Sequence, residues 1–402
     1  MTRTRRTGWL LAGLFAWFGA LFGSLAISVL DVQTAIGIGP GALGALLAIG
    51  FAIGACAQLG GGVSVERRGP MGALRFVVAL MAGALAVVAC APSPALLAVG
   101  VLLVLAVAGA LNATANACAV GVVTTDVRGF VRFHACYSAG AMSGALTGAA
   151  IESAGGSWRL VWGWWSVVGL ALAIAVGRVS TAAPSERPDP PSLRSLARLL
   201  ESPSVRDLAL LLCAAVAAAS AVDTWGIRFL RVERGASIIG GAGAYALAQL
   251  VAFVARLRLV PSSDARRSGP IVIISVLLAA GLVLESCTSI MWIGAVGLTL
   301  AAVAGALLIP LLLARCGLAK QPADEIAVVG AVGQLGFVIG PALVGAATSR
   351  SGSSAGLLAA ALLAVVTALG VQWRLSGRTI AVDGVVVVDD SESVMSGRVD
   401  DA

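Results

Sequence analysis

Long apolar runs alternate along the chain with short segments that carry most of its polar and charged residues. Twelve runs are long enough to form separate helices: 9–30, 41–63, 72–91, 94–122, 133–154, 158–179, 207–230, 236–260, 270–289, 291–315, 325–348 and 353–375. A membrane-spanning helix needs about 20 apolar residues, because backbone in lipid must satisfy its own hydrogen bonds. The runs lack the alternation of membrane β-strands. The pattern predicts an all-α integral membrane protein with twelve transmembrane helices.

The basic residues support this number of helices independently. With twelve crossings, nearly all of the 27 lysines and arginines fall on the same side of the membrane as the N-terminus. The exceptions are Arg159, Arg228, Arg231, Arg234 and Arg350. Short cytoplasmic loops of membrane proteins are rich in Lys and Arg. We therefore expect a multi-pass protein of a bacterial-type cytoplasmic (inner) membrane, with both termini in the cytoplasm.

The longest interruption of the apolar pattern divides the chain into two halves. Several prolines exclude a continuous helix there, and leucines on one helical face then favour a short amphipathic helix. We predict an N-terminal six-helix bundle at 1–179, a cytoplasmic linker containing this helix at 180–206, a C-terminal six-helix bundle at 207–376, and a disordered cytoplasmic tail at 377–402. An acidic, double-arginine segment follows the second helix of each half, so we expect the bundles to be pseudo-symmetric.

Composition excludes several other classes of protein. Of the 402 residues, 59% are hydrophobic and only 12% are charged, about half the charged fraction of a soluble domain. The net charge of +7 follows the membrane pattern and does not indicate binding of nucleic acid. Seven cysteines without paired spacing and a single histidine predict neither a metal site nor a cofactor. The chain lacks a phosphate-binding loop and any acid–histidine cluster, so we expect neither an ATP-driven pump nor an enzyme.

Two groups of motifs resemble a known family. Gly62-x-x-x-Glu66-Arg67-x-Gly69 resembles the loop signature of the major facilitator superfamily, with Glu in place of Asp. Other stretches resemble the bacterial branch of sugar-permease-like transporters related to fucose permeases: Asn116–Val120, Arg132–Gly140, Trp225 and Gly333–Pro341. The resemblance implies alternating access, in which two bundles rock about a central substrate site. It makes Glu66 and Arg67, with Asp264 and Arg266 as their second-half counterparts, candidates for a latch that pairs in one state.

Polar side chains within the apolar runs are candidates for the substrate or proton pathway, because ionisable groups are costly in a membrane. The candidates are Asp223, Trp225, Asp31, Asn112, Asn116, His134 and Gln334. An acid beside the Trp225 ring suits a sugar or a cation, although an interfacial aromatic belt also explains it. Asn112 and Asn116 are one turn apart and either line a cavity or bond between helices. His134 either titrates near neutral pH or only packs.

These patterns favour a secondary transporter that moves a small solute, sugar-like or otherwise organic, by alternating access. Its partners are the lipid bilayer and a small-molecule substrate, with protons as a candidate coupling ion, and we expect a monomer. Two alternatives stay open. Sparse polar groups equally suit efflux of amphipathic or drug-like compounds, and a non-transporting membrane sensor or scaffold would share the same pattern.

Overall fold

The computed structural model describes residues 3–122, 127–179, 198–258, 268–316, 322–375, 380–382 and 385–387. The N-terminal half contains α1 (Arg3–Ile36), α2 (Pro40–Cys90), α3 (Pro94–Val122), α4 (Val127–Ser153) and α5 (Trp158–Gly177). The C-terminal half begins with α7 (Pro203–Ala221), the π-helical turn η1 (Val222–Gly226) and α8 (Ile227–Glu233). It continues with α9 (Ile238–Arg258), α10 (Ser268–Cys287), α11 (Met291–Ala314), α12 (Pro322–Gln334), α13 (Gly336–Ser351), α14 (Ser353–Gly370) and the π-helical turn η4 (Val371–Leu375).

Twelve helical stretches in the described part of the chain are long enough to cross a membrane. Eleven of them are also strongly apolar, and α2 supplies two of these. The remaining one is α4, whose 27 residues extend over about 40 Å at ~1.5 Å per residue. The predicted twelve-helix membrane fold is confirmed. A break at Leu335 divides the predicted eleventh helix into α12 and α13.

Two predicted helix ends were wrong. A loop was expected between the second and third helices, but α2 runs for 51 residues and only bends there. Gly69 adopts a φ of 70°, which glycine tolerates, and the ring of Pro70 then prevents a straight helix. The first helix was expected to end at Leu30 but continues to Ile36, because nothing before Gly37 (φ 77°) breaks it. Asp31 therefore lies within α1.

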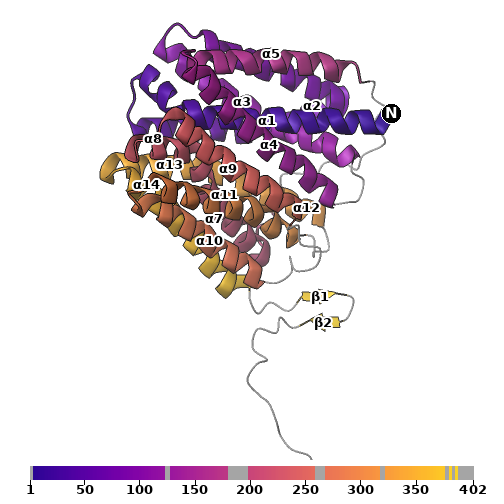
Figure 1. The fold of residues 1–402 in the computed structure, drawn as a ribbon. Helices are drawn as coiled ribbons and strands as arrows, with labels where there is room; N and C mark the ends of the chain where they lie inside the picture. The colour runs from indigo at the N-terminus through magenta and orange to yellow at the C-terminus, as the bar shows by residue number, and fades with distance from the viewer. Residues whose placement is uncertain are drawn as a thin grey trace, which may run out of the picture.

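The two halves have the same internal packing, which gives the molecule its pseudo-symmetry. In the N-terminal half α1 packs on α4, α2 on α3, and α2 on α5. In the C-terminal half the equivalent pairs are α7 with α12 and α13, α9 with α11, and α10 with α14. Figure 1 shows the indigo-to-magenta helices of the first half lying along the orange and yellow helices of the second.

Close helix packing in the N-terminal half depends on small residues. A Cβ added at Gly140 of α4 would overlap the backbone of Ala16 in α1, and a Cβ at Gly19 would overlap the backbone of Tyr137 in return. Glycine allows two helix backbones to approach closely without a hydrophobic driving force. The small-residue faces of these helices are therefore packing surfaces.

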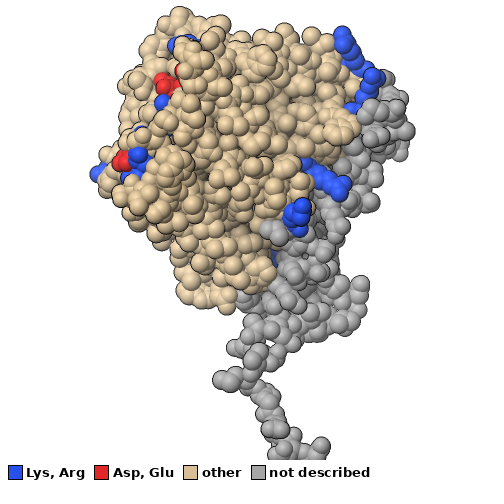
Figure 2. Space-filling view, viewed as in Figure 1, with Lys and Arg blue, Asp and Glu red and all other residues tan. Residues whose placement is uncertain are grey.

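Charged side chains lie at the two ends of the helices, with an apolar belt between them (Figure 2). We call the end where α1 begins the N-terminal face; Arg67, Arg132 and Arg258 are exposed there. The other end, the opposite face, carries Glu233 and Arg234. Large apolar side chains are exposed along the belt, including Val167 and Leu362. This distribution fits a protein surrounded by lipid.

Two predicted segments lie largely outside the described residues. Of the linker helix expected at 193–200, only residues 198–200 are described. In the tail, the described residues form two short strands, β1 (Ile380–Val382) and β2 (Val385–Val387). They pair antiparallel, with Ile380 opposite Val387.

Candidate functional site

A cavity of about 290 Å³, which we call the central cavity, lies between the two halves. One part of its wall is aromatic and consists of Phe15, Phe18, Phe22, Phe51 and Phe337. Its polar lining consists of Gln58, Asn112, His134, Tyr137, Asp223, Arg256 and Gln334. Ligand sites are typically apolar concavities with a few convergent polar groups. The central cavity has this character, and both halves of the chain contribute to it.

Asp223 is the acidic residue of the central cavity, and α9 holds its carboxylate in place. Tyr245 donates its hydroxyl to Oδ1 of Asp223 at 2.7 Å, and Nε2 of Gln249 donates to the same oxygen at 3.1 Å. Asp223 itself lies in the π-helical turn η1. Such turns insert one extra residue into a helix and are frequent at functional sites. The turn and the two donors fix the carboxylate at the cavity wall.

Arg256 is the cationic residue of the cavity and joins the two halves. It lies on α9, two turns beyond Gln249. Its Nη1 donates to the carbonyl oxygen of His134 at 3.5 Å and to the hydroxyl of Ser138, both on α4. Its field also reaches the Asp223 carboxylate. A solute in the cavity would therefore meet one acidic and one cationic side chain. The first is held by residues of α9, and the second is part of α9.

Three further predicted residues line the central cavity. The His134 ring meets Phe15 edge-on, with ring centroids 5.5 Å apart. Asn112 faces the cavity and accepts a hydrogen bond from Nδ2 of Asn116 at 3.1 Å. Gln334 lines the cavity at the break between α12 and α13. Asn112 therefore lines the cavity, as the first alternative expected, whereas the bond from Asn116 lies within α3 and does not join two helices.

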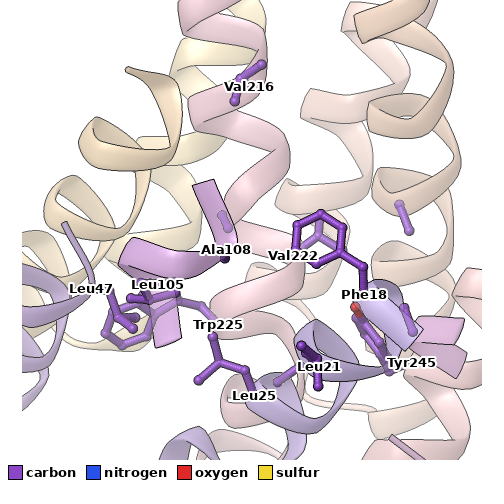
Figure 3. Packing of buried hydrophobic residues seen from close by; sticks show 14 of the residues in the cluster. Phe18, Leu21, Leu25, Leu47, Leu105, Ala108, Val216, Val222, Trp225 and Tyr245 are labelled. Carbon is purple, nitrogen blue, oxygen red and sulfur yellow. The ribbon is translucent and has the colours of Figure 1, made fainter. Parts of the chain in front are cut away.

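The structure places two other predicted residues away from the central cavity. Trp225 is only 2% exposed and packs in the same apolar cluster as Leu25 and Leu47 (Figure 3). It comes two residues after Asp223, so its side chain leaves the helix in a different direction. Asp31 is paired with Arg231 at the opposite face, at an Oδ2–Nη1 distance of 3.2 Å. The expected acid-and-aromatic pair is therefore not formed at the cavity.

Only one of the four latch candidates can be placed in detail. Arg67 is exposed at the N-terminal face, beside the bend at Gly69. The side chain of Glu66, together with Asp264 and Arg266, lies outside the described residues.

Sequence reasoning missed part of the polar cluster. Tyr245, Gln249 and Arg256 were not among the predicted pathway residues, although all three share one face of α9. Their spacing of four and then seven residues is the signal that could have found them. Tyr137 had no assigned role, although it also lines the cavity.

The halves also meet near the opposite face. A Cβ added at Gly44 of α2 would lie 2.9 Å from the Cα of Gly345 in α13. The segment α12, which precedes α13 in the same membrane span, packs on α7 of its own half. Near this end α1 is also joined to α8, through Asp31 and Arg231. These contacts close the central cavity toward the opposite face.

The helix arrangement matches solved transporter structures over nearly the full chain, although the sequences are distant. A variant of the nucleoside transporter NupG matches with a TM-score of 0.74 at 10% identity, covering 92% of this chain and 99% of that one. A bacterial homolog of the human lysosomal transporter Spinster gives 0.71 at 13% identity, covering 92% and 97%. The major facilitator superfamily transporter FucP gives 0.65 at 16% identity, covering 93% and 99%. The chain has the major facilitator superfamily fold.

This result confirms the fold implied by the loop signature around Arg67. No protein-family model matches the sequence, and no curated protein matches it. At these identities the neighbours show the major facilitator fold alone. The assignment of a function therefore depends on the residues of the central cavity.

Proposed function

We propose that the protein is a secondary transporter that moves a small organic solute through the membrane by alternating access at the central cavity. The observation that carries the proposal is the polar cluster of Asp223, Tyr245, Gln249 and Arg256 at a cavity between two pseudo-symmetric halves. Polar groups in a membrane are costly and mark solute pathways. FucP, one of the neighbours, is the fucose:proton symporter of E. coli.

The solute class follows from the two kinds of cavity wall. The charged pair of Asp223 and Arg256 suits hydroxyl, amine or carboxylate groups, and the five phenylalanines suit a ring or another apolar face. A sugar-like molecule and a larger amphipathic compound both fit this description. The aromatic wall is the specific observation that supports the second candidate function, efflux of amphipathic compounds.

The direction of the cavity follows from the charge pattern. The arginine-rich N-terminal face is proposed to lie in the cytoplasm of a bacterial-type cell. Because the halves close the opposite face, this structure then corresponds to a cytoplasm-facing state. His134 and Asp223 are the cavity groups available for proton coupling. If His134 carries the proton, His134→Gln should flatten the dependence of transport on pH.

The test begins with a thermal-stability screen of the detergent-purified protein against labelled sugars, nucleosides and amphipathic organic ions. A ligand of the folded state raises the unfolding temperature by mass action. Solutes that bind are then assayed for flux in proteoliposomes. We expect Asp223→Asn and Arg256→Gln to lower transport by ~10- to 100-fold, as expected for loss of charged hydrogen bonds worth about 1.5–3 kcal/mol.

Glu233→Gln is the matched control, because Glu233 is exposed at the opposite face and distant from the cavity. Tyr245→Phe removes one donor to Asp223 and keeps the ring, so it tests the cluster even if Asp223→Asn folds poorly. Equal flux in wild type, Asp223→Asn and Arg256→Gln would contradict the proposed site. Ligand-induced stabilisation without any flux would instead support a sensor.

A further inference from the structure

Glu285 is a carboxylic acid buried inside the C-terminal half without a hydrogen-bond partner. It lies in the last turn of α10 and is 0% exposed. Neither Oε1 nor Oε2 has a hydrogen-bond partner in the described part of the chain. An ionised carboxylate in such surroundings costs many kcal/mol unless it is paired, so buried acids of this kind bind a proton or another cation.

Among the residues that the structure describes, Arg234 is the charged side chain close to this carboxyl. Among the helices packed on α10, neither α11 nor α14 contains a titratable residue. The charged residues of α7 and η4, which are Arg206, Asp207 and Arg374, lie at the N-terminal face. The field of Arg234, which follows α8, does reach Glu285.

Arg234 is held beside Glu285 without forming an ion pair in this state. Its Nη2 donates to the carbonyl oxygen of Ser286 at 2.9 Å, and its guanidinium lies 4.6 Å from the centre of the Phe229 ring. Its Nε has no hydrogen-bond partner among the described residues. An unpaired carboxyl and an arginine with a spare donor are thus neighbours at the opposite face. A rotation of Arg234 would give a deprotonated carboxylate its counter-charge.

The π-helical turn η1 connects this carboxyl with the central cavity. A Cβ added at Gly226, the last residue of the turn, would lie 3.5 Å from Oε1 of Glu285. Asp223, in the same turn, points to the cavity and binds Tyr245. One short turn therefore contacts the buried carboxyl on one side and carries the cavity acid on the other.

We propose that Glu285 is a proton-binding site, which holds its proton in the state described here. On release, the O–H bond of the carboxyl breaks, the proton passes to water at the opposite face, and Arg234 compensates the negative charge. The turn η1 then transmits the change in charge to Asp223. The binding of the proton stands independently, whereas its coupling to a solute rests on the proposed transport function.

Infrared spectroscopy of the reconstituted full chain tests the site directly, since a protonated carboxyl has its own C=O stretching band. We expect a band from a buried, protonated carboxyl at neutral pH in the wild type. The Glu285→Gln variant should lose this component, and the control Glu233→Gln should keep it, because Glu233 is exposed. Glu285→Leu provides a second variant if Glu285→Gln folds poorly. An unchanged band in the Glu285 variants would overturn the proposal, as would a carboxylate that binds sodium instead of a proton.

Transport assays then distinguish proton binding at Glu285 from the coupling of that proton to solute transport. If both proposals hold, Glu285→Gln abolishes solute accumulation driven by a pH gradient, while solute exchange at equal pH stays within about twofold of wild type. Accumulation that persists in Glu285→Gln would overturn the coupling. If no solute is transported by wild type, the proposed function fails, and the infrared band still decides whether Glu285 binds a proton.

Discussion

Arg231 donates a hydrogen bond from Nη1 to Oδ2 of Asp31 at 3.2 Å, across the boundary between the two halves of the molecule. The same nitrogen donates to the carbonyl oxygen of Ile27 at 3.1 Å. One turn earlier on α8, Nε of Arg228 donates to Oε1 of Gln33 at 2.9 Å. These bonds join α1 to α8 at the opposite face. In an alternating-access cycle they have to break whenever the central cavity opens to that side.

Removing this ion pair should favour the state that is open to the opposite face. The side chains of Arg231 and Asp31 are 16% and 27% exposed, so solvent screens them and the pair contributes about 0.2–1 kcal/mol. We expect Arg231→Gln to shift the population by about 1.4- to 5-fold. The measurement is the alkylation rate of an Ala55→Cys probe in the cavity by an impermeant maleimide added from the opposite face, in a cysteine-free background.

Two controls accompany this prediction. Arg350→Gln removes an exposed arginine from the same face and should leave the alkylation rate unchanged. The double variant Asp31→Asn with Arg231→Gln should react no faster than Arg231→Gln alone, because that change already removes the bond to Asp31. Identical rates in wild type and Arg231→Gln would show that the pair does not hold the face closed.

Gly140 should tolerate no larger side chain. A Cβ at this position overlaps the backbone of Ala16, so Gly140→Leu must push α4 away from α1. Overpacking of this kind typically costs about 1–3 kcal/mol, and a lower unfolding temperature in detergent would report it. Gly83 on α2 has no atom near its Cβ position, so Gly83→Ala is the matched control and should stay within about 1 kcal/mol of wild type. An equal decrease of the unfolding temperature in both variants would argue against the close α1–α4 contact.

The helices could be predicted because their signals are local. Apolar length and arginine placement predicted twelve spans. The bend at Gly69 was mistaken for a loop, because a Gly-Pro pair signals a break without showing whether the helix resumes at once. The end of α1 was placed too early, because the polar residues Asp31 and Gln33 resemble a loop until their partners on α8 are known.

The cavity residues were harder to predict for a physical reason. In a soluble protein the apolar face of a helix marks the core, but in a membrane both the lipid and the interior are apolar. The sequence therefore identified Asp223 as a candidate but could not show that Trp225 points into the packed interior instead of the cavity. Arg256 has the same ambiguity, since a basic residue at a helix end also satisfies the charge pattern of a cytoplasmic loop.

Arg67→Ala should impair transport without preventing membrane insertion. Arg67 is exposed beside the bend of α2, where a guanidinium can pair with an acid of the other half in one state and separate from it in the other. Arg68 is the matched control, because its guanidinium lies 3.9 Å from the centre of the Phe76 ring and is already engaged within its own half. We expect at least a several-fold loss of uptake in Arg67→Ala and little change in Arg68→Ala. Uptake at the wild-type rate in Arg67→Ala would refute the latch.

Cysteine labelling should establish the orientation of the protein in the membrane. Cys90 and Cys287 are exposed where α2 and α10 end at the opposite face, so single-cysteine variants keeping either one should react with an impermeant maleimide in intact cells. An Arg258→Cys variant at the N-terminal face should react only after permeabilisation. Burial and the nearby Glu325 carboxylate raise the pKa of the Cys316 thiol to about 12, so Cys316 stays protonated and should react slowly on either side. Labelling of the cysteine at 258 but not of Cys90 in intact cells would reverse the orientation, and the cavity described here would then face the outside.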